Sequence, residues 1–552
     1  MGLEANIHLI RTLEKQIEEG NGNTIKLKRA RNSLLNVSTR VPPEMLGEIF
    51  IWMLLRDTNR SLRPSHFDGL QNGCYNFLLV CHHWFEVACR TPELWNLWGN
   101  TLQGWKTRHH RSGASPIDLL LNGNKCDPGV LFDGPLQAAV RNHFIQDSIR
   151  QVHLQSNDSD LLTAIISLLT PDDDGTRNEN IESIVWRTRG DQFVDASHFF
   201  AQSRLSKLRL LDLSGNIRIS SWDGLASWTT LLTNLSLGAG GFPTPPTITA
   251  SQLFQILASN PNLQELVLSD IALPNDAEGS DLQVPLLNLK LLSLTGDFRR
   301  VFGVLSRLIL PEALDEIYLI GFDSTVEEIS QTFAPYMRNY FRRDSRFQDR
   351  LGVSSRSAPG STSIAINVLG PQAAESAQKI PFVTFTMVLD DLLTPEAQEQ
   401  LLIDLIALIP REHVVFLDAK LNMKPPEGLF FGMSNIETLC LSDVELSEGF
   451  LQPNPDGPHA NTKLFPSLRW LYLESVEIDD DDWGHLTAYL AHQTSGNQLI
   501  SLEVLGAPHI SPMVMDEIRG LVGKFTYYQK PEVDGEGSPW GCGCSTPEED
   551  EW

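Results

Sequence analysis

The chain has 552 residues, of which 41% are hydrophobic and 20% are charged. These fractions are typical of folded globular proteins and exclude a chain that is collagen-like or disordered throughout. Asp and Glu number 69 against 43 Lys and Arg, which gives a formal net charge of −26. Because so acidic a surface repels phosphate backbones and anionic lipids, we expect neither nucleic acid nor a membrane as the main partner.

The N-terminal segment lacks the basic start and apolar run of a signal peptide, and no stretch reaches the ~18 apolar residues that would span a bilayer. The seven cysteines are odd in number, and most lie inside hydrophobic patterns. That usage is typical of a reducing compartment rather than of a disulfide framework. We therefore expect a cytoplasmic or nuclear protein.

Motifs of common enzyme sites are absent from the sequence, including the phosphate-binding G-x-x-x-x-G-K-[ST] loop, the H-E-x-x-H zinc helix and the G-x-S-x-G nucleophile turn. Cys542 and Cys544 supply only half of a zinc site. We expect no catalytic residue, no cofactor and no metal. A catalytic site assembled from distant positions is the alternative.

Residues 1–38 begin with a short predicted helix. Leu3, Ile7, Ile10 and Ile17 share one face of it, and the Gly and Asn residues at 20–23 end it. The apolar stripe is too short for a stable coiled coil. We expect this segment to pack on the rest of the chain.

Residues 39–98 predict a compact all-α module. Pro42 and Pro43 stand in the first turn of a helix, where the missing N–H costs nothing, and apolar residues follow at helical spacing through residue 53. A second apolar helix is predicted over residues 77–88, and a Thr-Pro-Glu-Leu-Trp segment at 91–95 breaks and restarts the chain. So short a segment carries more apolar surface than it can bury, and we expect it to dock on a partner.

The pattern V-P-P-E-M-L-x-E-I-F, followed by L-L-V-C-H-H-W-F-E-V-A and T-P-E-L-W, closely resembles the F-box, in particular the F-box-like proteins of mushroom-forming (basidiomycete) fungi. The resemblance covers residues 41–98. It implies binding to the small adaptor subunit of cullin-RING (SCF-type) ubiquitin ligases, and to the cullin indirectly. By position it implies an adaptor-binding set: Pro42, Pro43, Glu44, Leu46, Ile49, Phe50, Leu79, Val80, Cys81 and Trp84.

Some of these residues can instead be the core of the module itself. For Phe50, Val80 and Trp84 both interpretations stay open, since small helical modules share apolar residues between core and interface. A polar stretch at residues 56–75 separates the two helices and makes the module longer than a minimal F-box. This insertion leaves the strength of adaptor binding open.

The remainder of the chain repeats an L-x-x-L-x-L pattern. Three stretches, starting at Leu263, Ile436 and Leu468, align without gaps. Most neighbouring copies start about 24 to 32 residues apart, a period typical of leucine-rich repeats with one strand and one helix each. Further copies start at the following positions: Leu208, Leu232, Leu289, Leu314 and Leu499, with weaker ones at Ile149 and Ile181.

We therefore predict an α/β leucine-rich-repeat solenoid over residues 112–528. It should be irregular, because the Asn usual after the core leucines is found only at Asn216. The repeat is obscured between residues 320 and 430, where there is room for about four units, and residues 336–360 look inserted. Residues 529–552 are Gly-rich and acidic, and we predict that they are disordered.

A basic stripe lies within the predicted insertion. Arg338, Arg342, Arg346 and Arg350 recur every four residues, with Arg343 beside them. We interpret the stripe as a solvated or internally paired face, with an anion site as the alternative.

Alternation along the predicted strands sends the residues between the core leucines to one exposed face. There Tyr318, Arg469, Trp470 and Tyr472 form our candidate site for a protein client, since aromatic residues and Arg often anchor interfaces. The alternative is that they only cover neighbouring backbone.

These patterns favour an adaptor protein that holds a ligase through one module and a client through the other. The runner-up is a leucine-rich scaffold or regulator that binds partners outside any ubiquitin ligase.

Overall fold

The computed structural model describes most of the chain between residues 11 and 529, with gaps. Outside the described part lie mainly residues 1–10, 17–25, 32–40, 61–79, 99–109, 124–133, 171–178, 239–247, 270–281, 344–349, 370–381, 390–393, 422–428, 445–463, 495–498 and 530–552. Several predicted features therefore lie outside the described residues: the apolar stripe of the N-terminal helix, Leu79, Arg346, and the tail cysteines Cys542 and Cys544. Residues 11–16 are helical.

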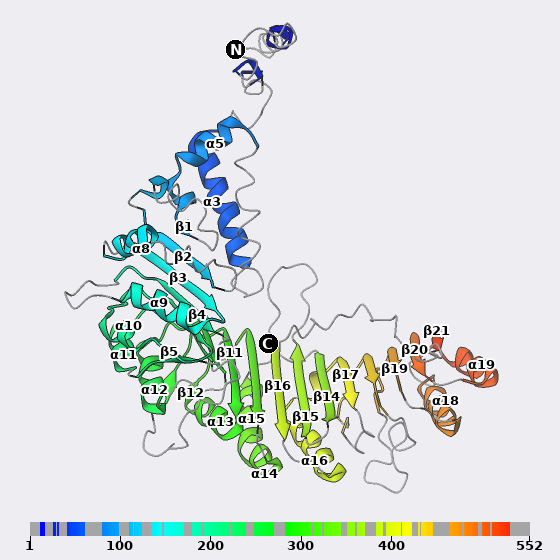
Figure 1. Ribbon diagram of the computed structural model, residues 1–552. Coiled ribbons are helices and arrows are strands. Elements are labelled where there is room, and N and C mark those ends of the chain that lie inside the picture. Colours follow the sequence, from blue (N-terminus) through cyan, green and yellow to red (C-terminus); the bar gives the residue numbers. More distant parts are fainter. Residues whose placement is uncertain are drawn as a thin grey trace. The chain divides into compact units, whose positions relative to one another are not determined.

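The chain divides into two compact units, residues 1–288 and 289–552. This division falls inside the range for which we predicted one continuous solenoid. Each unit mixes α-helices with a mostly parallel β-sheet, and the helices of each unit lie along one side of its sheet (Figure 1).

Unit 1 begins with a small helical region. Helix α3 (Pro43–Arg60) starts at a proline, and its Leu46 N–H donates to the carbonyl of Pro42 at 3.0 Å. Helix α5 (His82–Cys89), the 3₁₀ helix η4 (Pro92–Trp95) and the short strand β1 (Leu97–Trp98) follow.

Two boundaries in this region differ from the prediction. Helix α3 continues to Arg60, into the stretch that we predicted as a polar loop from residue 56. Helix α5 starts at His82, because Cys81 is extended and caps it, whereas we predicted a helix from residue 77. Local composition suggested the helices, but the capping geometry sets where they start.

The sheet of unit 1 is parallel throughout its described strands. In pairing order, its strands are β1, β2 (Ile117–Asn122), β3 (Ile149–Ser156), β4 (Ser183–Thr188), β6 (Leu210–Ser214), β8 (Asn234–Gly238) and β9 (Glu265–Ser269). Its helices are α8 (Gly134–Ile145), α9 (Ser159–Leu169), α10 (Ser197–Gln202), α11 (Asp223–Trp228) and α12 (Ala250–Ser259). Shorter strands are β5 (Val194–Asp195), β7 (Ile217–Arg218) and β10 (Val284–Pro285).

The register of this sheet stacks the repeated apolar residues into ladders. Leu211 of β6 pairs with Ile184 of β4 on one side and Leu235 of β8 on the other, and all three are at most 1% exposed. Each strand therefore covers the apolar side chains of the next. Burying this apolar surface stabilises the fold by roughly 25 cal/mol per Å² of surface removed from water.

Gly215 closes one of these strands where no other residue fits. Its φ is +95°, and a Cβ there would clash with the carbonyl oxygen of Thr188 on the neighbouring strand. The chain can turn this close to β4 only because glycine has no side chain.

Unit 2 contains a longer sheet that is not parallel throughout. In pairing order, its strands are β11 (Leu291–Asp297), β13 (Glu316–Phe322), β16 (Phe382–Leu389), β15 (Ser361–Leu369), β14 (Arg350–Ala358), β17 (Phe416–Leu421), β18 (Thr438–Ser442), β19 (Trp470–Glu474), β20 (Ser501–Ala507) and β21 (Lys524–Gln529). The short strand β12 (Leu308–Ile309) lies apart from this order.

Helices connect most strands of unit 2. They are α13 (Phe298–Leu305), α14 (Val326–Glu328), the π-helix η5 (Ile329–Phe333), α15 (Ala334–Arg343), α16 (Pro395–Ile406), the 3₁₀ helix η7 (Arg411–His413), α18 (Asp480–Thr494) and α19 (Pro512–Leu521).

The middle of this sheet is an antiparallel meander. Strand β14 pairs antiparallel with β15, which pairs antiparallel with β16, and the chain then returns so that β16 lies beside β13 and β14 beside β17. Strands β15 and β16 lie in the range where the repeat is obscured and where we expected about four units, but their antiparallel pairing means that they do not form successive parallel repeats. Residues 336–343 belong to α15 and residues 350–358 to β14, so both ends of the predicted insertion are parts of the unit.

The basic stripe does not form one helix face, because α15 ends at Arg343 and Arg350 begins strand β14. At the other end of the unit, Gln529 is the last residue of strand β21, whereas we predicted it as the first residue of the disordered tail.

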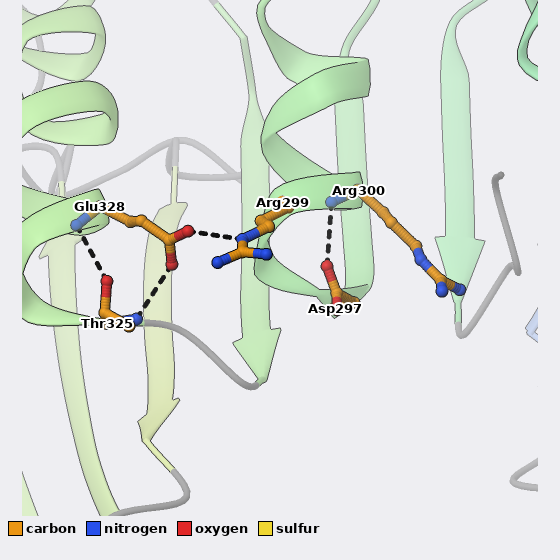
Figure 2. Close-up of polar contacts among 5 residues, drawn as sticks. All are labelled: Asp297, Arg299, Arg300, Thr325 and Glu328. Atoms are coloured by element: carbon orange, nitrogen blue, oxygen red, sulfur yellow. Dashed lines mark hydrogen bonds and ion pairs between the residues drawn. The ribbon is translucent and has the colours of Figure 1, made fainter. Parts of the chain in front are cut away.

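Side chains cap two neighbouring helices of unit 2 and join them (Figure 2). Asp297 caps α13 by accepting the Arg300 N–H at 3.2 Å. Thr325 and Glu328 form a reciprocal capping box at the start of α14. Arg299 of α13 donates to the Glu328 carboxylate at 2.5 Å, so the ends of the two helices are held together.

We predict that Leu441→Ala lowers the free energy of unfolding by about 2–5 kcal/mol, because Leu441 of β18 is 1% exposed between two neighbouring strands. Urea unfolding of the full chain measures the loss. Thr438→Ala, on the half-exposed face of the same strand, is the control and should cost less than about 1 kcal/mol. Equal losses would contradict the assignment of the two faces.

Candidate functional site

The first candidate surface lies on the small helical region of unit 1, which has its own core. Leu46 and Phe50 of α3 pack with Val87 and Ala88 of α5 and with Leu94 and Trp95 of η4. The Trp84 ring lies 5.1 Å from that of Phe50, and the Trp95 indole N–H donates to the carbonyl of Ala88 at 2.8 Å. These contacts tie the three helices into one unit.

This core bears on the open interpretations of Phe50 and Trp84 and on the predicted adaptor-binding residue Leu46. Leu46 and Phe50 are 2% and 0% exposed and belong to the core of the module. Trp84 is partly buried against the same core.

Helix α3 carries a second apolar stripe on its outer side. Met45, Ile49, Trp52 and Met53 follow one another at steps of four, three and one, which places them on one helix face. They are 59%, 43%, 60% and 43% exposed. We call these four residues the outer face of α3. Apolar side chains gathered in this way on a protein surface usually mark a binding site for another molecule.

Neighbouring residues extend the exposed surface. Val80 and Phe85 are 55% and 40% exposed, whereas Cys81 caps α5, its Sγ accepting the Trp84 N–H at 3.5 Å. Pro42, Pro43 and Glu44 are exposed at the start of α3, where a carboxylate interacts favourably with the helix dipole.

Of the predicted adaptor-binding residues, Pro42, Pro43, Glu44, Ile49 and Val80 are exposed. Met45, Trp52, Met53 and Phe85, which the prediction did not include, are exposed apolar residues of the same region. Their signal was present: α3 is apolar at positions 45, 49, 52 and 53 as well as at 46 and 50, so it has two apolar faces.

The second candidate surface lies on the sheet of unit 2. Trp470 and Tyr472 of β19 point to the same face, and Arg469 just before them is exposed. Tyr318 lies on β13, and β16, β15, β14, β17 and β18 separate it from β19. At ~4.8 Å per strand this is roughly 29 Å, so the structure does not bring Tyr318 together with the other three residues.

The face that contains Trp470 and Tyr472 is half-buried or exposed, whereas the alternate residues of the same strands are buried. We call it the open face of β17–β21. Its residues are Phe416, Asp418, Lys420, Thr438, Cys440, Ser442, Trp470, Tyr472, Glu474, Glu503, Leu505, Lys524, Thr526 and Tyr528.

Titratable groups gather at the centre of this face. Burial raises the pKa of the Cys440 thiol to about 12, and the nearby Asp418 and Glu474 carboxylates add to the effect. Burial also raises the pKa of Asp418, with a further contribution from Glu474. The thiol is therefore protonated at neutral pH and is a poor nucleophile.

The corresponding face of unit 1 is largely closed. Leu120, His153, Val185 and Asp212 are less than 9% exposed, and the polar groups there are engaged with one another. The His153 Nε2 lies 2.8 Å from the Ser183 hydroxyl. Two ion pairs accompany it: Arg150 with Asp118 at 2.6 Å and Arg187 with Asp212 at 2.5 Å. This face offers less accessible surface to a partner than the open face of β17–β21.

The described residues hold no group of three or more His, Cys, Asp or Glu side chains close enough to bind a metal ion. Among the helices of the described part, none combines the length and apolar character needed to cross a bilayer.

We predict that His153 makes unit 1 less stable in acid. Burial, with a smaller effect of Arg187, lowers the pKa of His153 from 6.5 to about 4. Between about pH 6.5 and pH 4, His153 is protonated in the unfolded chain but neutral in the folded chain. The free energy of unfolding therefore falls as pH falls through this window. Replacing His153 with Gln should flatten that dependence in urea unfolding. The exposed His198→Gln serves as the control and should leave the slope as in the unmodified protein; an equal slope in both variants would contradict the assignment.

No protein-family model matches the chain, and no curated protein matches it significantly. The resemblance of residues 41–98 to the F-box therefore rests on the residues themselves.

Proposed function

We propose that this protein is the substrate-recognition subunit of a cullin-RING (SCF-type) ubiquitin ligase. The F-box-like module at residues 39–98 binds the small adaptor subunit, and a leucine-rich-repeat region binds a protein client. The observation that carries the proposal is the outer face of α3. Its four apolar residues are at least 43% exposed, whereas Leu46 and Phe50 of the same helix are at most 2% exposed in the core of the module.

A helix with two apolar faces can pack against its own module through one face and against a binding partner through the other. Leu46 and Phe50 attach α3 to its own module, whereas Met45, Ile49, Trp52 and Met53 are at least 43% exposed on its outer side. Trp and Met are both enriched at the centres of protein interfaces, where their burial supplies much of the binding energy. The same helix carries part of the pattern that resembles the F-box, and this resemblance implies that the partner is the ligase adaptor.

The repeated strands support the second half of the proposal. Successive copies of L-x-x-L-x-L form neighbouring parallel strands, for example β18, β19 and β20, with their apolar residues in register. We assign these to an irregular leucine-rich-repeat solenoid whose regularity is interrupted by the β14–β16 meander. In such an arrangement the alternate residues, including Trp470 and Tyr472, are available for a client.

The chain then acts by proximity. Binding a client and the ligase at once makes ubiquitin transfer effectively intramolecular, so the rate rises without a catalytic group on this chain. We infer a non-enzymatic role without cofactor or metal, in the cytoplasm or the nucleus.

We predict that the double substitution Trp52→Ala and Met53→Ala weakens adaptor binding about 100-fold or more, because two central apolar contacts are lost. Isothermal titration of the full chain with purified adaptor subunit measures the affinity. Leu46→Ala is unsuitable for this purpose, since it removes a buried core residue and would weaken binding through loss of stability alone.

The matched control is Leu287→Ala with Met513→Ala, which removes apolar side chains that are 63% and 78% exposed elsewhere. It should leave the adaptor affinity within about twofold. If the unmodified protein does not bind the adaptor, or if the Trp52 and Met53 variant binds as tightly, the ligase proposal is wrong. A scaffold acting outside a ligase would then be the better account.

A further inference from the structure

The register of unit 2 places two carboxylates on either side of Cys440. One row across the open face of β17–β21 contains Asp418, Cys440, Tyr472 and Glu503, on β17, β18, β19 and β20 respectively. Glu474 lies in the next row, on the same strand as Tyr472. Because neighbouring strands are ~4.8 Å apart, Asp418 and Glu474 flank Cys440 from its two neighbouring strands.

Lys420 lies close enough to Asp418 to lower the pKa of that carboxyl, but this effect is smaller than those of burial and of Glu474, which raise it. Lys420 pairs with Asp443 at 3.2 Å, and Lys524 approaches Glu503 to 3.8 Å. Glu474 accepts a hydrogen bond from Ser442 at 3.4 Å, which carries no charge. The mutual repulsion of Asp418 and Glu474 raises the pKa of Asp418, after the larger effect of burial.

Aromatic and small side chains border the same place. Trp470 and Tyr472 are half-buried on β19, with their side chains on the face that contains Cys440. On the other side, Gly352 and Ser354 of β14 stand opposite Asp418 and Lys420. A segment that crosses the strands therefore meets the aromatic side chains Trp470 and Tyr472 on β19, and the small residues Gly352 and Ser354 on β14.

We propose that the open face of β17–β21 binds an extended, basic segment of a client protein, with an arginine or lysine side chain held over Cys440 between Asp418 and Glu474 and against Tyr472. This inference rests on the proposed function and names the chemistry of the client. Lys420 also pairs with Asp443, so it compensates these carboxylates only in part. A cationic side chain supplies further positive charge, and the faces of Tyr and Trp rings attract cations. Nucleic acid has the wrong charge for this surface.

The test uses a display library of random 12-residue peptides selected against the full-length protein. We expect arginine or lysine to be enriched at least about fivefold at one position of the selected peptides. The best selected peptide should then bind the Asp418→Asn, Glu474→Gln double variant 10- to 100-fold more weakly. Glu412→Gln with Glu517→Gln is the control, since it removes the same charge from exposed positions of the same unit, and should change the affinity less than twofold.

Selected peptides without basic enrichment, or peptides that bind the double variant as tightly as the unmodified protein, would overturn the inference. The folded state of the double variant is checked by its thermal midpoint, which should not fall because a repulsion has been removed. Titrating the same variant with the ligase adaptor separates the two proposals. Peptide binding concerns only unit 2, whereas adaptor binding depends on the outer face of α3.

Discussion

The two units depend on one constraint: the apolar residues of each strand must be covered by the strand beside it. Leu439 and Leu441 of β18 stand between Leu417 and Ala419 of β17 and Leu471 and Leu473 of β19, and all are at most 1% exposed. A strand alone could not bury these side chains, so each repeat gains its stability from its neighbours. Because side chains alternate along a strand, the same constraint leaves every second residue on the opposite face, where it is available for other interactions.

The strands of the two units use that opposite face differently. In unit 1, Arg150, Arg187 and His153 are satisfied by groups from neighbouring strands, and much of the face is buried. In unit 2, Asp418 and Glu474 lie together and the aromatic residues of β19 are half-exposed. A paired, buried surface stabilises the fold, while an unbalanced and accessible one favours association, so the proposed client site belongs to unit 2.

The sequence predicted the elements better than their arrangement. The L-x-x-L-x-L copies at Leu208, Leu263, Ile436 and Leu468 each lead into an observed strand, because alternation and spacing are local properties. The β14–β16 meander was missed, since alternating apolar residues look the same in parallel and antiparallel strands. That meander also separates Tyr318 from Trp470, which no local pattern could indicate. On α3, the two stripes overlap in sequence, so the buried Phe50 and the exposed Trp52 looked alike.

The proposed ligase function depends on contact between the outer face of α3 and the adaptor. Site-specific photo-crosslinking measures that contact: a benzophenone amino acid replaces Trp52 in the full chain, and the protein is irradiated with purified adaptor subunit. We expect a covalent adduct with the adaptor from position 52, and none when the same group replaces the exposed Leu287. An adduct from neither position, or equal yields from both, would contradict it.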